Sequence, residues 1–129
     1  MKKEKIKKRK REQKAVLKAK VYIKSSFNNT LISATDERGN VFAWSSTGMA
    51  GFKGTKKSTT YASSQAARII INKMQEAQVK EIDLFIAGVS SGRDAAIRAF
   101  SSANFKIRKI KDITPIPHNG CRPKRPRRI

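Results

Sequence analysis

The chain has 129 residues, enough for one domain, and its 30 lysines and arginines against 9 aspartates and glutamates give a formal net charge of +21. Self-repulsion of this size opposes a compact state, so we expect a polyanionic partner. The single cysteine excludes an intrachain disulfide. No apolar run approaches the length of a membrane span. No secretory signal is expected at the N-terminus, because it lacks an apolar core.

The positive charge is concentrated at the two ends of the chain. Residues 1–20 hold 11 basic and 2 acidic side chains, and residues 106–129 hold 9 and 1, against 10 and 6 in between. We therefore predict a basic N-terminal tail over 1–17 that is disordered when free, a single α/β domain over 18–113, and an extended, basic, Pro/Arg-rich C-terminal tail over 114–129.

The first half of the predicted domain has the pattern of three strands. Residues 19–24 alternate apolar with mainly lysine side chains, which is typical of a strand with one buried face. Two further strands are predicted over 30–36 and 41–47, and residues 36–40, DERGN, have the composition of a hairpin turn. The short links favour an antiparallel meander. The residues predicted to share the buried face of the first strand are Ala19, Val21 and Ile23.

The second half alternates helices with strands. A helix capped by Ser58 or Thr59 is predicted over 59–78, because apolar side chains recur there at helical spacing. Residues 81–88 are typical of a strand inside a sheet, and a glycine turn over 88–94 leads into a second helix. The predicted apolar stripes are Ala62, Ala66, Ile69, Ile70, Met74 and Ala77 in the first helix, and Ala96, Ile97, Phe100 and Ala103 in the second.

The last predicted strand is marked by Ile107, Ile110 and Ile113, whose irregular spacing indicates a bulge. The order of elements is therefore β-β-β-α-β-α-β. Because helix crossovers join parallel strands, we expect an α/β fold with a mixed five-stranded sheet, flanking helices and a basic extended tail at each end.

Residues 48–58, GMAGFKGTKKS, form a basic loop between a predicted strand and a predicted helix. Glycine turns and helix N-termini attract anions, so this loop is expected to hold phosphate. A nucleotide-binding P-loop needs G-x-x-x-x-G-K-[ST], and here a lysine, Lys53 or Lys56, stands where the second glycine belongs. Nucleotide binding is therefore the weaker alternative, and a simple tight turn would not need the additional cations.

Catalytic and metal-binding arrangements are not expected. His118, the only histidine, and Cys121 supply two donors where a structural zinc needs four, and a nucleophilic pair also needs an oxyanion site. The carboxylates are too scattered in the sequence to predict a two-metal site. We therefore expect no enzyme activity, no cofactor, no metal and no small-molecule substrate.

The basic ends and glycine loops indicate a nucleic acid, and RNA more than DNA. DNA readers usually place a helix in the major groove, yet the predicted helix over 59–78 carries only Arg68 and Lys73 as cations. Extended Pro/Arg tails suit folded RNA, because they thread between its helices and order on binding. Another kind of basic nucleic-acid-binding protein is the alternative, whereas a membrane surface is not expected, since no apolar face accompanies the lysines.

Three segments of the sequence are similar to one protein family. SSFNNTLISATDERGNVFAWSSTGMAGFKGTKKST, GRDAAIRA and DITPIPHNGCRPKRPRRI closely resemble ribosomal small-subunit protein eleven, and the similarity runs from about Lys20 to the C-terminus. The resemblance implies a ribonuclease-H-like fold without the acidic cluster of that enzyme, in agreement with the predicted order of strands. It also implies a structural role without catalysis.

The resemblance further implies partners and a location. Members of the family lie on the platform of the small subunit, bridge ribosomal RNA helices and help to form the cleft for the messenger's Shine–Dalgarno duplex. Ribosomal proteins seven and eighteen are their neighbours. We therefore expect this chain in the cytoplasmic ribosome of a bacterium or in the ribosome of an organelle.

The resemblance and the basic segments together suggest RNA-binding residues. Asn28 and Asn29 match the family's FNNT turn, Arg93 matches its second glycine turn, and residues 118–122 match its tail motif. No catalytic or metal-binding residue is expected. The residues expected to bind RNA are Asn28, Asn29, Lys53, Gly54, Lys56, Lys57, Arg93, His118, Asn119, Arg122, Lys124, Arg125, Arg127 and Arg128.

Overall fold

The computed structural model of the chain describes residues 17–128. The predicted N-terminal tail over 1–17 therefore lies outside the described residues, except for Leu17. The predicted order of strands and helices is confirmed, and a short 3-10 helix, η1 (Gly54–Ser58), was not predicted. The other elements are β1 (Lys18–Ser25), β2 (Thr30–Thr35), β3 (Val41–Ser46), α1 (Thr60–Glu76), β4 (Glu81–Ala87), α2 (Ser91–Ser102) and β5 (Lys106–Asp112).

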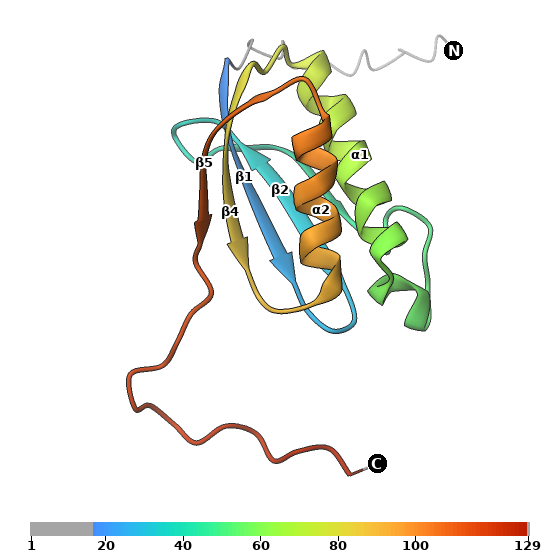
Figure 1. Cartoon of the computed structure of the whole chain (residues 1–129), viewed down its shortest axis with the longest axis vertical. Coiled ribbons are helices and arrows are strands. Elements are labelled where there is room, and N and C mark those ends of the chain that lie inside the picture. Colours follow the sequence, from blue (N-terminus) through green and yellow to red (C-terminus); the bar gives the residue numbers. More distant parts are fainter. Residues whose placement is uncertain (1–16, 129) are drawn as a thin grey trace, which may run out of the picture.

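The five strands form one mixed sheet in the order β3-β2-β1-β4-β5. β1 pairs antiparallel with β2, and β2 with β3, whereas β1, β4 and β5 run parallel (Figure 1). The antiparallel meander, the parallel crossovers and the ribonuclease-H-like mixed sheet are thus confirmed. Because of these directions, β1, β3, β4 and β5 all end at the same edge of the sheet, which we call the carboxyl edge.

Both helices lie on one face of the sheet (Figure 1). α1 packs on β2 and β3, α2 packs on β1, and the two helices pack against each other. The predicted buried face of β1 is confirmed, because Ala19, Val21 and Ile23 are at most 2 % exposed. Burying a large apolar side chain contributes roughly 1.5–3 kcal/mol, so this layer holds the fold together. Its largest buried side chains include Ile23, Ile32, Met74, Leu84 and Phe100.

The apolar stripe of α1 is wider than predicted. Ile69 is only half-buried, whereas Ala67 and Ile71, which the predicted stripe omitted, are buried. The reason is that α1 contacts α2 as well as the sheet, so two neighbouring sides of the helix are covered. The stripe positions that are buried as predicted are Ala62, Ala66, Ile70, Met74 and Ala77.

The structure agrees with two local predictions made from the sequence, the cap of α1 and the bulge in β5. Thr59 caps α1, since its Oγ1 accepts a hydrogen bond of 3.2 Å from the Ala62 amide. The register between β4 and β5 shifts by one residue, which places the predicted bulge at Arg108. None of the described helices is long and apolar enough to cross a bilayer.

The second face of the sheet has no helix over it in the part of the chain that the structure describes (Figure 1). Large side chains on this face are therefore open to solvent, with Trp44 58 % exposed and Leu31 47 % exposed. The sequence pattern predicted flanking helices but did not indicate that both would cover the same face.

Candidate nucleic-acid interface

The carboxyl edge gathers segments that are far apart in the sequence. The turn after β1, the basic loop after β3, the glycine turn after β4 and the C-terminal tail after β5 all leave the sheet there (Figure 1). Each residue predicted to bind RNA lies in one of these four segments, except Arg93, which lies in the first turn of α2. The fold thus brings the predicted residues to one end of the sheet.

Buried hydroxyl groups join these segments to each other. Thr30 Oγ1 lies 2.9 Å from Ser63 Oγ on α1 and 3.5 Å from Ser25 Oγ at the end of β1. Ser25 Oγ also bonds to the hydroxyl of Ser90 in the glycine turn. Ser25, Thr30 and Ser63 are at most 3 % exposed, so water does not compete for these bonds. The network fixes the turns relative to α1, and it was not predicted from the sequence.

Asn28 and Asn29 have different roles in the turn after β1. Asn29 Oδ1 accepts hydrogen bonds from the Thr30 amide at 2.9 Å and from the hydroxyl of Thr47, so it joins this turn to the end of β3. Asn28 is exposed beside Phe27, which is itself 81 % exposed. The fold therefore uses the Asn29 oxygen internally and presents Asn28 to a partner, and contact of either with RNA stays a prediction.

The backbone of the basic loop is ordered by its own hydrogen bonds. The amides of residues 49–52 donate to oxygens of Ser46, Thr47 and Gly48. Phe52 anchors the loop on α1 through an edge-to-face contact with Tyr61, with ring centroids 5.8 Å apart. A nucleotide phosphate cradle needs amides that point at the ligand, and these four amides are already engaged.

The side chains of the basic loop supply the charge. Lys53 and Lys56 are exposed, and Lys57 is half-buried. Gly54, at φ 60, begins η1, and the carbonyl of Lys56 accepts hydrogen bonds from the amide and hydroxyl of Thr59, at 3.3 and 2.8 Å. The lysines therefore extend from a backbone that is tied to the start of α1.

A cluster that we call the tail root holds the start of the C-terminal tail. Asp112 Oδ1 accepts hydrogen bonds from the Thr114 amide at 2.9 Å and from its hydroxyl at 2.6 Å. The Gly88 amide donates to Thr114 Oγ1 at 3.1 Å. Hydrogen bonds from Thr114, and then from Arg93, lower the pKa of Asp112 to about 2. The tail thus leaves β5 in a defined direction.

Arg93 belongs to this tail root. Its Nη2 donates to Asp112 Oδ2 at 2.8 Å, and its Nη1 donates to the Gly88 carbonyl at 3.0 Å. The side chain is 25 % exposed, so it links the glycine turn to the end of β5 from a half-buried position. Two of its nitrogens are engaged within the protein, and its contact with RNA stays a prediction.

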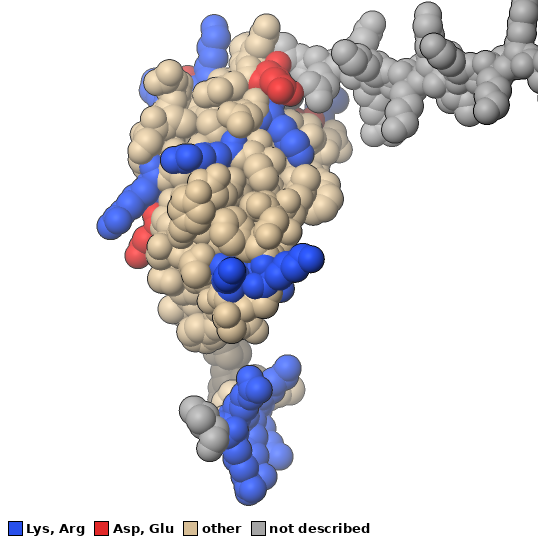
Figure 2. All heavy atoms as spheres, turned by 90° about the vertical axis from the view of Figure 1, so that its right-hand side faces the viewer, with Lys and Arg blue, Asp and Glu red and all other residues tan. Residues whose placement is uncertain are grey.

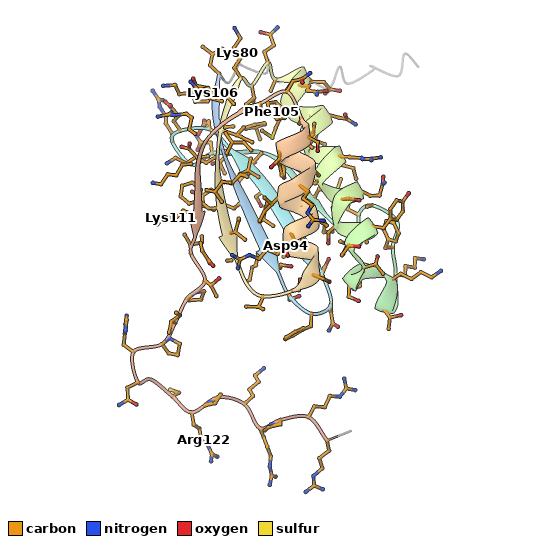
Figure 3. The ribbon with its side chains drawn as sticks, in the orientation of Figure 1. Lys80, Asp94, Phe105, Lys106, Lys111 and Arg122 are labelled. Atoms are coloured by element: carbon orange, nitrogen blue, oxygen red, sulfur yellow. The ribbon has the colours of Figure 1, made fainter. Side chains whose placement is uncertain are left out.

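Beyond the tail root the chain runs away from the domain (Figure 1), and every side chain over 115–128 is exposed. Lysines and arginines line this segment (Figure 2), and Arg122 projects from it (Figure 3). Asn119 turns the chain with φ 57, and Cys121 is exposed. The predicted residues that lie here are His118, Asn119, Arg122, Lys124, Arg125, Arg127 and Arg128.

The chemistry of this arrangement suits an extended polyanion. The turn 26–29, the loop 47–59, the turn 88–90 and the tail 113–128 contain no acidic residue. Cations without opposing carboxylates attract phosphate groups and release counterions when they bind them. Among residues 17–128, no three His, Cys, Asp or Glu side chains are grouped so that they could hold a metal ion.

Comparison with known families matches the chain to one of them. The family model described as ribosomal protein S11 matches residues 19–128, a range that includes all four segments of the carboxyl edge and nearly the whole sheet. This agrees with the resemblance carried by the motifs in those segments. The chain therefore belongs to the ribosomal protein S11 family and is a structural protein of the small ribosomal subunit that binds ribosomal RNA.

Proposed function

We propose that this protein lies on the platform of the small subunit and bridges several ribosomal RNA helices by binding their phosphates. The observation that supports this most is the convergence, at one edge of the sheet, of four segments that contain no acidic residue. Phosphate contacts position a protein on RNA, and contacts made from several segments can hold more than one helix.

In this proposal two parts of the protein bind RNA. The domain over 18–113 presents the basic loop, in which Lys53, Lys56 and Lys57 replace counterions and Gly54 permits close approach of the backbone. The tail over 114–129 extends along a neighbouring helix. No step of this function is catalytic.

The same proposal describes the surroundings of the protein. Ribosomal proteins seven and eighteen lie next to it, and its surface forms part of the cleft for the messenger's Shine–Dalgarno duplex. The ribosome is that of a bacterium or of an organelle. These details are supported by family membership together with the motifs GFKGTKKST and TPIPHNGCRP.

The test is the salt dependence of binding to small-subunit RNA. Each neutralised phosphate adds about 0.7 to 0.9 to the slope of log affinity against log salt. Replacing Lys53, Lys56 and Lys57 by Ala is therefore expected to lower the slope by roughly 2 to 3 and to weaken binding at every salt concentration.

A matched control removes the same charge at the opposite end of the molecule. Lys80 and Lys106 lie there, far from the carboxyl edge (Figure 3), and Lys73 lies in the last turn of α1. Replacing these three lysines by Ala is expected to change the slope less than the loop variant does. Equal slopes for the wild type and the loop variant would rule out the phosphate role of the basic loop.

A further inference from the structure

We propose that the uncovered face of the sheet is a second RNA contact, on which unpaired bases stack against Trp44 and Tyr22. The proposal rests on the proposed function in one respect, since both take ribosomal RNA as the partner. It concerns a different surface, however, and different chemistry, because bases rather than phosphates make the contact.

The sheet brings the aromatic side chains together from distant parts of the sequence. The register pairs Trp44 of β3 with Ser33 of β2, Ser33 with Tyr22 of β1, and Tyr22 with Phe85 of β4. The neighbours of Trp44 and Tyr22 along their strands, such as Ala43 and Val21, are buried under the helices, so this row lies on the opposite, open face.

Trp44 and Tyr22 keep ring surface available for a ligand. Trp44 is 58 % exposed and Tyr22 is 36 % exposed. Phe85 stacks on Tyr22 with a centroid distance of 5.1 Å and an angle of 16°, and Lys109 Nζ lies 5.8 Å from the centre of the Phe85 ring. Phe85 thus supports Tyr22 from one side. On the other side Tyr22 has only the small Ser33 beside it in the row, and Trp44 follows on the next strand.

Charge on the open face favours a nucleic acid over an apolar protein partner. Lys20 and Lys24 stand two residues before and after Tyr22 on the same face of β1. Lys109 and Lys111 extend the positive charge on β5, where the register pairs them with Asp83 and Phe85. Asp83 lies between Lys20 and Lys109 and offsets one of these four positive charges, so the surroundings of the rings remain positive. Lys111 projects outward from β5 (Figure 3). Lysines around exposed aromatic rings match the phosphates and bases of a single nucleotide strand.

Unpaired nucleotides are the form of RNA that fits this face. Bases inside an A-form helix are stacked on each other and out of reach, whereas loops and bulges offer bases that can stack on protein rings. An open sheet with surface aromatic side chains is an established platform for such bases. The rings on β1, β3 and β4 provide this platform here.

The open face is continuous with the phosphate-binding edge. Lys24 directly precedes the last residue of β1 and the turn that contains Asn28. Lys111 directly precedes Asp112 of the tail root. An RNA segment held at the carboxyl edge can therefore pass onto the open face without leaving the protein.

The experiment uses the fluorescence of Trp44, the only tryptophan of the chain. The full-length protein is titrated with a ten-nucleotide single-stranded uridine RNA and, separately, with a duplex RNA of equal phosphate number at the same salt. We expect the single strand to quench Trp44 at saturation and the duplex to bind with little quenching. Quenching should persist at saturation in the variant that lacks Lys53, Lys56 and Lys57, which separates this proposal from the proposed function.

Substitutions test whether the ring itself binds the base. With labelled single-stranded RNA, Trp44→Leu and Tyr22→Leu are each expected to weaken binding about tenfold, the typical effect of losing one stacked base, whereas Trp44→Phe and Tyr22→Phe retain most of the affinity. Circular dichroism checks the fold of each variant. Unchanged affinity in both Leu variants would overturn the proposal. So would quenching of Trp44 by a second ribosomal protein but not by RNA alone, which would identify a protein as the occupant of this face.

Discussion

The basic loop and the C-terminal tail both bring cations to the carboxyl edge, but the fold holds them in different ways. The loop is bonded along its own backbone, anchored by Phe52 on Tyr61 and joined to the cap of α1 at Thr59. In the described part of the tail, hydrogen bonds to the domain are confined to its start, near Thr114, and all side chains from 115 to 128 are exposed.

This difference has an energetic consequence for RNA binding. A loop that is already ordered loses little conformational entropy when it binds, whereas each tail residue that becomes ordered costs about 1 to 2 kcal/mol of backbone entropy. The tail can in return follow the surface of its partner over a long distance. We therefore expect each cation of the loop to contribute more affinity than each cation of the tail, although the tail has more cations.

The largest effect on RNA binding is expected from the tail. Deleting residues 115–129 removes five cations and should lower the salt slope by roughly 3.5 to 4.5, which is more than the loop variant does. The domain should still unfold cooperatively, because the described side chains that are lost are all exposed. Filter binding across a salt series and thermal circular dichroism measure the two outcomes.

A full-length variant separates charge from chain length in this test. It carries glutamine at Arg122, Lys124, Arg125, Arg127 and Arg128 and should show nearly the same slope as the deletion. We expect the affinity lost for each charge removed to be smaller in the tail than in the loop. Equal losses per charge would contradict the expectation that the order of the loop strengthens its binding to RNA. Loss of cooperative unfolding in the deletion would show that the tail belongs to the core.

The next largest effect is expected at Gly88, which should disturb the tail root but not the basic loop. Gly88 has φ 91, and a Cβ there would lie 1.8 Å from the Ser25 carbonyl oxygen. Gly88→Ala should therefore cost about 3 kcal/mol of unfolding free energy from strain and overpacking. Amide exchange should rise at position 88, because its amide no longer reaches the Thr114 hydroxyl, and should change less at Phe52.

Gly39 provides the matched control for that substitution. It has the same φ of 91, but a Cβ there would meet nothing within 4 Å. Gly39→Ala should thus lower the free energy of unfolding by only about 1 kcal/mol, because the unfavourable backbone angle is the one source of strain there. Chemical denaturation measures this loss. Equal losses for the two variants would contradict the close approach of the glycine turn to β1.

The smallest effect is expected from acid at the tail root. The pKa of Asp112 falls from 3.8 to about 2. A carboxyl with a lowered pKa stabilises the folded state above its unfolded pKa, and this contribution is lost as the pH falls through the folded pKa. The tail root should therefore persist from neutral pH down to 3.8 and loosen between 3.8 and about 2, while the basic loop stays unchanged.

Nuclear magnetic resonance can follow this loosening at the Thr114 amide. Its chemical shift should inflect near pH 2 in the wild type and show no such step in Asp112→Asn. An inflection at the ordinary value of 3.8 would mean that the hydrogen bonds from Thr114 and Arg93 do not stabilise the carboxylate in solution.

Short-range patterns were sufficient to predict most of the fold. Alternation placed the buried face of β1. The sequence offered Ser58 or Thr59 as the cap of α1, and the cap is Thr59. Irregular isoleucine spacing indicated a bulge in β5, which lies at Arg108. η1 was missed because GTKKS has no periodicity, and its geometry depends on the contacts of the loop with α1. The burial of Ile71 was missed because it depends on how α1 packs against both the sheet and α2.

The candidate site was only partly predictable for the same reason. Its cations could be found as runs and motifs, but the ion pair between Arg93 and Asp112 depends on where the end of β5 lies relative to the first turn of α2. The row of Trp44, Tyr22 and Phe85 likewise appears only when the strand order is known. One member of the hydroxyl network could have been predicted to be buried. Ser25 comes two residues after Ile23, so it continues the buried face of β1.

The bulge in β5 also affects how copies of the protein meet each other. β5 is an outer strand, and outer strands invite pairing with another chain and hence aggregation. Here Arg108 interrupts the regular ladder, and lysines flank it at positions 106, 109 and 111. A second copy that approached this strand would meet a broken register and like charges. The β5 edge of the free protein is thereby protected from strand pairing until RNA neutralises its charge.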